Sequence, residues 1–317
     1  MDVVSDAVSA IRIGQPSSNR VRVGGSWCTR IAPYDGAGFH VVLEGSCWLL
    51  PDGGSPVSLG AGDVVLLPHG TGHVIADAPA DAATVSRALP FERWLGGNGP
   101  DPARAASRHV EMLCGKYRLD RSRMHPLMAE LPEVVHLPNR VGAHVELRAA
   151  VDLLGHEVGA QRPGACVAVP SLLDLLLVYM IRSWAARGSG TWPTVLGDPV
   201  AAAALRALHS DLAAPWTNDR LAAEAGVSRA TLARRFTTLV GRPPMAYLTW
   251  WRLTFAATLL RDTPHPLATV ARRVGYSTPY ALSHAFSREF GTTPGQYRAS
   301  AVRSKSLPGR PKSPTML

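Results

Sequence analysis

Short apolar runs alternate with turn-forming residues along the first third of the chain. In the segments 21–31, 38–59 and 60–77, such runs are separated by Gly, Asp and Pro. This rhythm is typical of antiparallel strands joined by tight turns. It predicts an all-β sandwich or barrel, to which residues 109–119 (HVEMLCGKYRL) are expected to add a further strand.

A helical pattern follows over residues 171–184, with Ser171 as a suitable N-cap. One apolar stripe along this helix consists of Leu173, Leu176, Leu177, Met180 and Trp184. Leu172, Leu175 and Tyr179 lie off the stripe, so the helix is expected to be covered on more than one side. A second copy of the chain would supply that cover, which predicts a homodimer.

Two segments lack the composition of a packed element. Residues 185–195 (AARGSGTWPTV) are small, Gly-rich and Pro-containing, which predicts a linker. Residues 300–317 have no apolar periodicity and are expected to form a disordered basic tail. Everything between these two segments has a helical pattern.

The net charge of +9 is unevenly divided along the 317 residues. Residues 1–195 carry 17 Lys and Arg against 18 Asp and Glu, whereas residues 196–317 carry 16 against 6, a net charge of +10. The basic third therefore favours a polyanionic partner. With 46% hydrophobic and 18% charged residues, the composition excludes collagen, coiled-coil fibre and general disorder.

The cysteines and the N-terminus indicate a cytoplasmic protein. Cys28, Cys47, Cys114 and Cys166 are separated by 19, 67 and 52 positions, which excludes CxxC and zinc-finger spacing. The N-terminus has acidic residues where a signal peptide needs basic and apolar ones, and no uncharged apolar run reaches the roughly 20 residues that span a membrane. No membrane segment is expected.

The basic third contains an internal repeat, in which residues 221–248 align with residues 270–298. The recurring pairs are Gly226 and Gly275, Phe236 and Phe286, Gly241 and Gly291, Pro244 and Pro294, and Tyr247 and Tyr297. The offset grows from 49 to 50 residues, so one copy has an extra residue in its turn. Two copies of one small unit are therefore predicted.

Each copy has the pattern of a helix-turn-helix, over 217–237 and 267–290. The predicted caps and turns are Thr217, Gly226 and Ser228 in the first copy and Gly275, Thr278 and Pro279 in the second. The predicted inward-facing pairs are Leu232 with Phe236 and Leu282 with Phe286. A helix over 245–261, about 25 Å long at about 1.5 Å per residue, is expected to hold two recognition helices about 34 Å apart, one turn of duplex.

The helical part resembles the DNA-binding domain of AraC/XylS transcription regulators over residues 198–298. The matching segments are LAAEAGVSRATLARRF, GRPPMAYLTWWRLTFAATLL and VARRVGYSTPYALSHAFSREFGTTPGQYR. The resemblance implies that the start of each second helix enters the major groove of double-stranded promoter DNA, and that activators of the family contact RNA polymerase. The expected base contacts are Arg229, Thr231, Arg234, Tyr280, Ser283 and His284, and the expected phosphate contacts are Arg235 and Arg288.

Residues Gly62–His73 have the spacing G-x5-P-x-G-x2-H, which resembles the second cupin motif. The first cupin motif is poorly kept, since Gly38 stands at its glutamate position. An iron or manganese site with three histidines and one glutamate is therefore not expected. A different set, His40, Cys47, His73 and Cys114, would suit zinc; the alternative for these residues is ordinary packing or the lining of a small-molecule pocket.

No catalytic motif supports an enzyme, because G-x-S-x-G, the Walker lysine loop, G-x-G-x-x-G after a strand and H-E-x-x-H are all missing. His69 and Glu44 are interpreted as turn and surface residues rather than an acid–base pair. Two alternatives to an effector-controlled regulator remain. One is a cupin-type metalloenzyme fused to a DNA-binding module, and the other is a metal or redox sensor that switches through Cys47 and Cys114.

The sequence thus predicts a multidomain, non-enzymatic regulator. It comprises an N-terminal all-β cupin-like sensor barrel with following helices (1–170), a dimerisation helix and linker (171–197), an all-α DNA-binding domain with two helix-turn-helix motifs (198–299) and a basic tail (300–317). An unidentified small-molecule effector is expected to control promoter binding by a homodimer.

Overall fold

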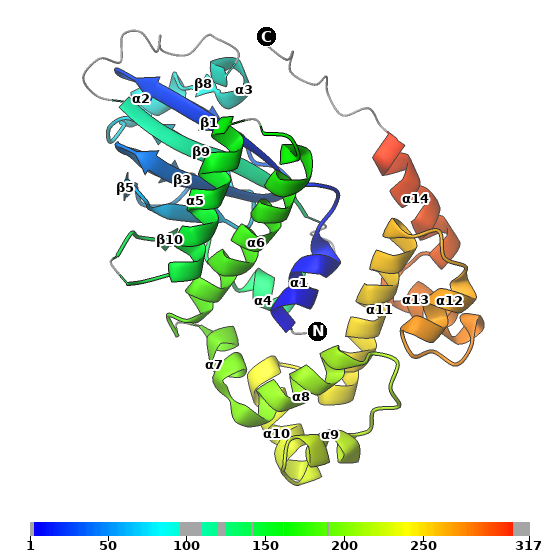
Figure 1. The fold of residues 1–317 in the computed structure, drawn as a ribbon. Helices are drawn as coiled ribbons and strands as arrows, with labels where there is room; N and C mark the ends of the chain where they lie inside the picture. Colours follow the sequence, from blue (N-terminus) through cyan, green and yellow to red (C-terminus); the bar gives the residue numbers. More distant parts are fainter. Residues whose placement is uncertain are drawn as a thin grey trace. The chain divides into compact units, whose positions relative to one another are not determined.

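The computed structural model describes residues 3–95, 109–119, 124–140, 142–160, 162–188 and 190–306. The chain divides into two units, Ala7–Pro193 and Met1–Asp6 together with Thr194–Leu317. We name the first the barrel unit and the second the helical unit, in keeping with the elements that Figure 1 shows in each. The boundary at Pro193 falls inside the segment 185–195.

The described strands of the barrel unit form two five-stranded sheets. The first has the order β1-β9-β3-β6-β10, with the bounds Ser17–Gly24, His109–Arg118, Gly36–Glu44, Val64–Leu67 and Val135–Leu137. The second has the order β5-β4-β7-β2-β8, with the bounds Val57–Gly60, Ser46–Pro51, His73–Ala76, Cys28–Ile31 and Leu89–Pro90. Neighbouring strands in these sheets are antiparallel except the parallel pair β2 and β8. The predicted β architecture is confirmed.

Apolar side chains from both sheets share one core. β6 is buried at every position because it lies between two other strands of its sheet. The core cluster contains Val21, Val23, Trp27, Val42, Cys47, Leu49, Leu59, Val65, Leu67, Ile75, Trp94, Val110, Met112 and Cys114. Side chains alternate between the two faces of a strand, so His40 shares the inward face of β3 with Val42, and His73 shares that of β7 with Ile75.

Two long helices, α5 (Val145–Ala160) and α6 (Ala165–Ala185), lie side by side over the first sheet (Figure 1). The hydroxyl of Tyr117 on β9 donates a hydrogen bond to the carbonyl of Leu173 (2.6 Å), which fixes α6 against the sheet. Shorter helices in the described part of this region are α2 (Ala82–Ser86), α3 (Phe91–Arg93) and α4 (Pro126–Ala129). The unit boundary after Asp6 falls inside α1 (Val3–Ile11).

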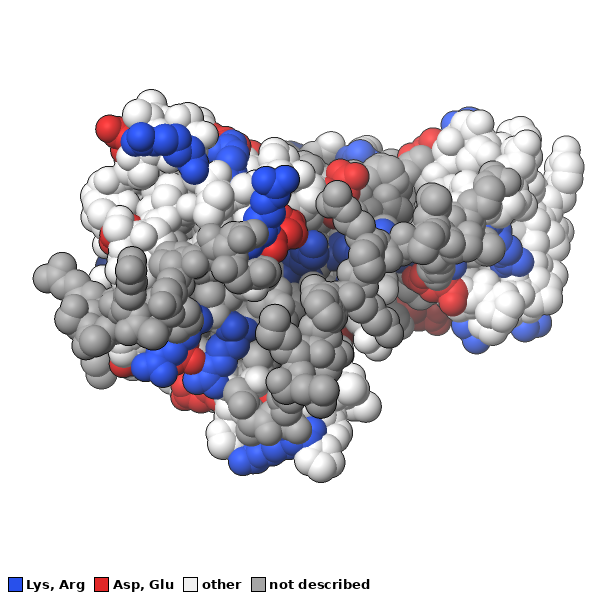
Figure 2. Space-filling view, turned by 90° about the horizontal axis from the view of Figure 1, so that it is seen from above, with Lys and Arg blue, Asp and Glu red and all other residues white. Residues whose placement is uncertain are grey.

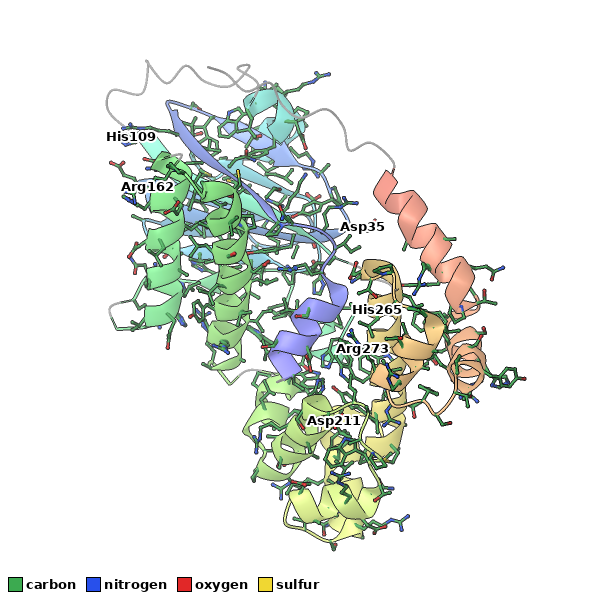
Figure 3. All side chains as sticks on the ribbon, turned by 45° about the vertical axis from the view of Figure 1, so that its right-hand side comes forward. Asp35, His109, Arg162, Asp211, His265 and Arg273 are labelled. Carbon is green, nitrogen blue, oxygen red and sulfur yellow. The ribbon has the colours of Figure 1, made fainter. Side chains whose placement is uncertain are left out.

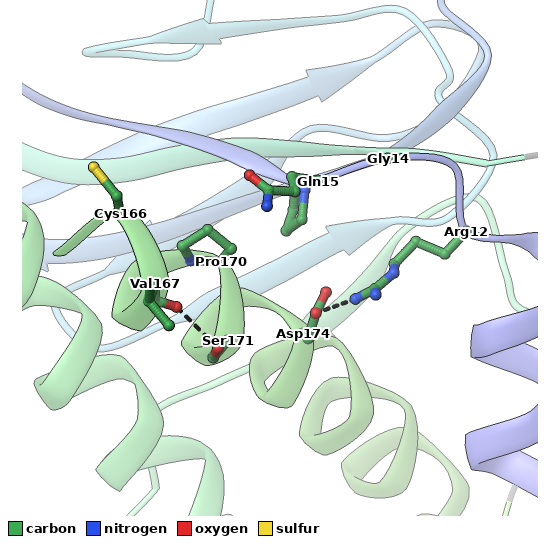
Figure 4. A pocket seen from close by; sticks show the side chains of 9 residues that line it. Arg12, Gly14, Gln15, Cys166, Val167, Pro170, Ser171 and Asp174 are labelled. Carbon is green, nitrogen blue, oxygen red and sulfur yellow. Dashed lines mark hydrogen bonds and ion pairs between the residues drawn. The ribbon is translucent and has the colours of Figure 1, made fainter. Parts of the chain in front are cut away.

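α6 begins earlier than the sequence pattern predicts. Its N-cap is Gly164, and Ser171 instead donates from Oγ to the carbonyl of Val167 within the helix (2.9 Å; Figure 4). Pro170 hides this start, because proline usually marks a helix boundary. The predicted apolar stripe is confirmed, since Leu173, Leu176, Leu177, Met180 and Trp184 are all buried. Among the described helices, α6 alone has the length and composition to cross a membrane.

A helix replaces part of the predicted linker, so that prediction was wrong over α7 (Thr191–Gly197). The ring of Trp192 is buried, and its centroid lies 5.0 Å from that of His125. The carboxylate of Glu130 accepts a hydrogen bond from the Trp192 amide (3.1 Å). One buried tryptophan thus orders a segment whose average composition indicates flexibility.

The helical unit contains α8 (Pro199–Ser210), α9 (Asn218–Glu224), α10 (Arg229–Val240), α11 (Pro244–Asp262), α12 (Leu267–Arg273), α13 (Pro279–Phe290) and α14 (Pro294–Ser306). The predicted caps are confirmed, because Thr217, Ser228 and Thr278 each accept a hydrogen bond from an amide of the helix that follows. α9 and α10 form the first helix-turn-helix, and α12 and α13 form the second. α11 joins them.

The predicted disordered tail is corrected over residues 300–306, because α14 continues to Ser306. Arg298 holds this helix to the end of α11 by donating to the carbonyl of Leu260 (3.3 Å). The ring of Tyr297 packs edge-on against Phe286, with centroids 5.4 Å apart. Residues 307–317 of the predicted tail lie outside the described residues.

The equivalent glycines of the two turns provide a matched test of the fold. Gly226 (φ +65°) and Gly275 (φ +76°) both take the left-handed conformation, but an added Cβ would meet nothing at Gly226. At Gly275 it would lie 2.8 Å from the Leu212 carbonyl oxygen. We expect Gly226→Ala to cost about 1–2 kcal/mol through backbone strain alone, and Gly275→Ala to cost more. Denaturant unfolding of both variants measures the difference; equal losses would contradict the close packing around Gly275.

Candidate nucleic-acid interface

The second helix of each helix-turn-helix, α10 or α13, carries every predicted DNA contact. α10 buries Leu232 and Phe236 completely, and α13 buries Leu282 and Phe286 completely. The predicted inward pairs are therefore confirmed. With one face of each helix committed to the core, the opposite face remains on the surface, where it can meet another molecule.

Two arginines near the start of α10 are exposed. The Arg229 guanidinium lies 3.8 Å from the carboxylate of Asp219, and both side chains are mostly exposed, so this ion pair is weak. Arg234 has no hydrogen bond or ion pair within the described residues. Thr231 is half-buried, and its hydroxyl accepts a hydrogen bond from the capping Oγ of Ser228 (3.0 Å). Thr231 therefore also stabilises the start of the helix.

The start of α13 exposes an aromatic ring. Tyr280, the second residue of the helix, is 81% exposed. His284 and Arg288 lie further along on the exposed side, without a hydrogen bond or ion pair among the residues described, and Ser283 is half-buried. An exposed tyrosine flanked by polar and cationic groups can contact both bases and phosphates.

Arg235 forms an ion pair within the protein, and its predicted contact with phosphate stays a prediction. Its Nε donates to Oδ2 of Asp198 (2.7 Å), and its Nη2 lies 2.6 Å from the same atom. Asp198 is also the N-cap of α8, where it accepts hydrogen bonds from the amides of Val200 and Ala201. Together these bonds hold the pKa of Asp198 below its usual range despite the opposing effect of burial. Arg235 thus fixes α10 to α8.

Arg252 on α11 connects the second turn to the rest of the helical unit, and no sequence motif indicates this role. Its Nε donates to the carbonyl of Leu212 and its Nη2 to that of Ala214, both at 2.8 Å. Partial burial lowers its pKa, although the Tyr276 hydroxyl and the Asp211 carboxylate oppose that effect. The guanidinium also fills the space beside Gly275. Asp211 itself caps the loop that follows α8 (Figure 3).

A buried polar contact joins the first residues of the chain to this unit. His209 on α8 lies between the carboxylate of Asp6 (Nδ1 to Oδ2, 2.7 Å) and the hydroxyl of Tyr247 on α11 (Nε2 to Oη, 2.8 Å). Burial, followed by the charge of Asp6, raises the pKa of Tyr247 well above its usual value. Sequence reasoning missed this contact because Asp6 and His209 are 203 residues apart.

The helical unit also carries exposed basic residues outside α10 and α13. Arg272 and Arg273 end α12 and are exposed (Arg273 is labelled in Figure 3). On the face drawn in Figure 2, blue and red residues are interspersed rather than gathered in one field.

In the barrel interior His40 and His73 are in contact, and Cys114 on β9 is the cross-strand partner of His40. Nε2 of His40 lies 2.8 Å from Nε2 of His73, and both rings are buried. Nδ1 of His73 donates to the carbonyl of Thr71 (3.0 Å), so the Nε2 of neutral His73 accepts from His40. Desolvation by burial lowers the pKa of both imidazoles and keeps them neutral.

The predicted zinc set of His40, Cys47, His73 and Cys114 is corrected, because the described residues contain no group of three or more ligands placed to hold a metal. Cys47 and Cys114 instead belong to the apolar core. Burial raises the pKa of Cys47 to about 12 and raises that of Cys114 further. Since the thiolate is the reactive form, this environment also disfavours a redox switch at these two positions.

The helical unit is basic and contains two helix-turn-helix motifs, and the second helix of each motif exposes polar residues at its start. This arrangement defines a DNA-binding protein. Residues 221–300 match the Helix-turn-helix domain family, and residues 2–186 match the Cupin family. The chain belongs to the AraC-like transcription regulators, with an N-terminal cupin-like ligand-binding domain.

Relatives of nearly full length support this assignment. An AraC-like transcription regulator of Streptomyces antibioticus is 32% identical over 94% of this chain and 98% of its own length. The HTH-type transcriptional regulator MtrA of Neisseria gonorrhoeae is 30% identical, again over 94% and 98%. Among solved structures, the DNA-binding domain of AdpA in complex with a target DNA is 36% identical over 35% of this chain and 99% of its own (TM-score 0.32). These relatives are named as transcription regulators, which gives no support to the alternative of a metalloenzyme.

Adjacent arginines on α10 provide a test of the interface. We expect Arg234→Ala to weaken binding to a cognate site by about 1–3 kcal/mol and to relax specificity at one base pair, with little change in stability. Arg235→Ala should lower stability as well, because it releases Asp198, and Asp198→Asn should reproduce that loss. Binding titrations and thermal unfolding of the three variants separate these effects. A destabilised Arg234→Ala would contradict its assignment as an unpaired surface residue.

The histidine pair predicts an acid-sensitive barrel. Histidine in the unfolded chain titrates near pH 6.5, whereas folding lowers the pKa of His40 and His73, so the unfolded state binds more protons below that pH. The free energy of unfolding should therefore fall between pH 7.5 and 5.5, by up to about 1.4 kcal/mol per pH unit for each imidazole. Thermal unfolding should show a smaller fall in a double variant with leucine, of similar volume, at both positions. An equally steep fall would assign it to other groups.

Proposed function

We propose that the chain controls transcription by placing α10 and α13 in successive major grooves of promoter DNA, with occupancy governed by an effector of the barrel unit. One observation carries this proposal: the side chains of Arg229, Arg234 and Tyr280 are exposed on the second helices of the two motifs. These side chains project into solvent, while Leu232 and Phe286 hold the same helices to the core. Arg235 serves as a positioning residue, and Arg288 contacts phosphate.

The proposal includes a homodimer formed through the outer faces of α5 and α6. Leu153 is 56% exposed and Val167 is 74% exposed. Leu175 is a further exposed apolar residue. A second copy of the chain would remove these apolar side chains from water. A dimer also doubles the number of helix-turn-helix units that engage one promoter.

An effector acts in this proposal only through a difference in its affinity for two arrangements of the dimer. One relative, from Escherichia coli, is a transcriptional activator specific for RCS, and is 27% identical over 82% of this chain. On that ground we include contact with RNA polymerase. The proposed activity involves no catalysis by the chain. We place it in the cytoplasm, where promoter DNA is found.

Selection of genomic fragments by the purified full-length protein tests sequence-specific binding. We expect discrete sites near promoters, with binding that persists at about 150 mM salt. The Arg234→Ala, Tyr280→Ala double variant should lose this selection. Arg206→Ala, which removes an exposed charge from α8 outside both helix-turn-helix units, should retain it. Unselective binding that disappears with added salt would reduce the helical unit to a general polyanion-binding module.

Sedimentation equilibrium tests the proposed dimer. Val167→Asp places a charge on the most exposed apolar position of α6, and should shift the wild-type dimer to monomer at the same protein concentration. Circular dichroism checks that the barrel remains folded. An unchanged dimer in a folded variant would exclude this face of α6 from the interface.

A further inference from the structure

The second helices of the two helix-turn-helix motifs present different side chains at equivalent positions of the repeat. On each helix, side chains four residues apart share the face that points away from the buried pair. These outermost residues are all exposed: Ala230, Arg234 and Thr238 on α10, and their counterparts Tyr280, His284 and Arg288 on α13. The outer face of α10 is therefore one long cation between two small residues, whereas that of α13 starts with a large aromatic ring.

The outer face of α10 has the chemistry of a helix that reads bases. The Arg234 guanidinium carries five donors in a fixed fork and has no hydrogen bond or ion pair within the described residues. Such a fork matches O6 and N7 of guanine, and this pair is the commonest specific contact in the major groove. Ala230, one turn earlier, leaves room for a close approach, and its methyl group can contact that of a thymine.

The outer face of α13 is less suited to distinguishing bases. Tyr280 is 81% exposed at the helix start, which is the part of a recognition helix that meets base edges. A tyrosine hydroxyl and an imidazole offer single hydrogen bonds, which discriminate less well than a bidentate pair. Arg288 lies two turns beyond Tyr280, near the end of the helix. α13 therefore favours affinity over base discrimination.

The first helices of the two motifs show the opposite distribution of charge. α12 ends with Arg272 and Arg273, which are exposed and have no hydrogen bond or ion pair in the part of the chain that is described. Their counterparts at the end of α9 are Ala223 and Glu224. The arginine of α9, Arg220, instead lies against the ring of a tryptophan. Because the first helix of such a motif crosses the DNA backbone, the second motif is the better equipped to hold phosphates.

A surface hollow of about 500 Å³ lies beside Arg272, between the end of α12 and the start of α13. Arg272, Ser277 and Pro279 line it together with small residues and Tyr276, and its described lining includes no acidic side chain. The hydroxyl of Ser277 is exposed and has no hydrogen-bond partner within the described residues. A guanidinium and a hydroxyl in one concave place are donors that a phosphate accepts from. The hollow thus suits a phosphate of a DNA strand.

We propose that the two motifs divide the recognition of DNA between them. The first motif reads the sequence, with Arg234 on a guanine, and the second motif holds the phosphate backbone through Arg272 and Ser277. The site on DNA then has unequal halves, with bases strongly specified where α10 lies and weakly specified one duplex turn away, where α13 lies. This division of roles rests on the proposed function, since it assigns tasks within one protein–DNA complex.

The experiment compares Arg234→Ala with Arg272→Ala in the full-length protein by titration with DNA at several salt concentrations. The duplexes are a site selected from genomic fragments by the wild-type protein, copies of it in which each guanine in turn is replaced, and one unrelated sequence. Arg234→Ala should lose about 5- to 150-fold in affinity for the selected site, and should lose nothing further when the guanine that Arg234 reads is replaced. Arg272→Ala should lose one common factor on every duplex, and its slope of log affinity against log salt should be smaller by about 1.

Two matched variants control for position and for charge. His284→Ala changes the counterpart of Arg234 and should select the same sequence as the wild-type protein. Arg206→Ala removes an exposed charge of α8 outside both motifs, and should change neither the affinity for the selected site nor the salt slope. All four substituted side chains are exposed, so the variants should fold as the wild type does, which circular dichroism checks.

The outcomes separate this division of roles from the proposed function. An equal loss by Arg234→Ala on every duplex, or a loss by Arg272→Ala that depends on sequence, would overturn the division. A selected site with equally specified halves, altered by His284→Ala as strongly as by Arg234→Ala, would also overturn it and leave the proposed function intact. If the wild-type protein selected no discrete site, the proposed function would be rejected, and the division of roles with it.

Discussion

The guanidinium of Arg252 sets the geometry on which the candidate interface depends. It donates to two carbonyls in the loop after α8 and lies against the turn at Gly275, so one half-buried cation connects α11, α8 and the second helix-turn-helix. Its direct hydrogen-bond acceptors are two carbonyl oxygens of this loop, and the charge of Asp211 also favours the protonated guanidinium, so the loop conformation is a condition for burying the arginine. The side chains of Trp251 and Tyr247 are fully buried, which anchors α11 in the core of the helical unit.

The surface of the helical unit divides its charged residues between two tasks. Arg235 and Arg252 are held by acceptors of the protein, whereas Arg229 and Arg234 extend into solvent with weak or no ion pairing in the described residues. Neighbouring positions of α10 thus differ in function although the residue type is the same. The distinction arises from Asp198, whose carboxylate caps α8 and binds Arg235 at once. Net charge alone cannot separate these roles.

Local patterns predicted much of the fold, because caps, turns and periodic apolar positions are properties of neighbouring residues. The N-caps Ser228 and Thr278 and the stripe on α6 are examples. Predictions failed where a distant partner decides the outcome. Trp192 orders α7 through Glu130, and Cys47 and Cys114 pack in the apolar core, where the described residues form no metal-binding group.

The contact of Asp6 with His209 changes how the order of domains along the chain is understood. Residues Met1–Asp6 belong to the helical unit, although the barrel unit follows them directly. The helical unit therefore includes residues from the start of the chain as well as those that follow the barrel unit. Cutting the chain at the linker would leave a fragment in which a buried histidine has lost its carboxylate.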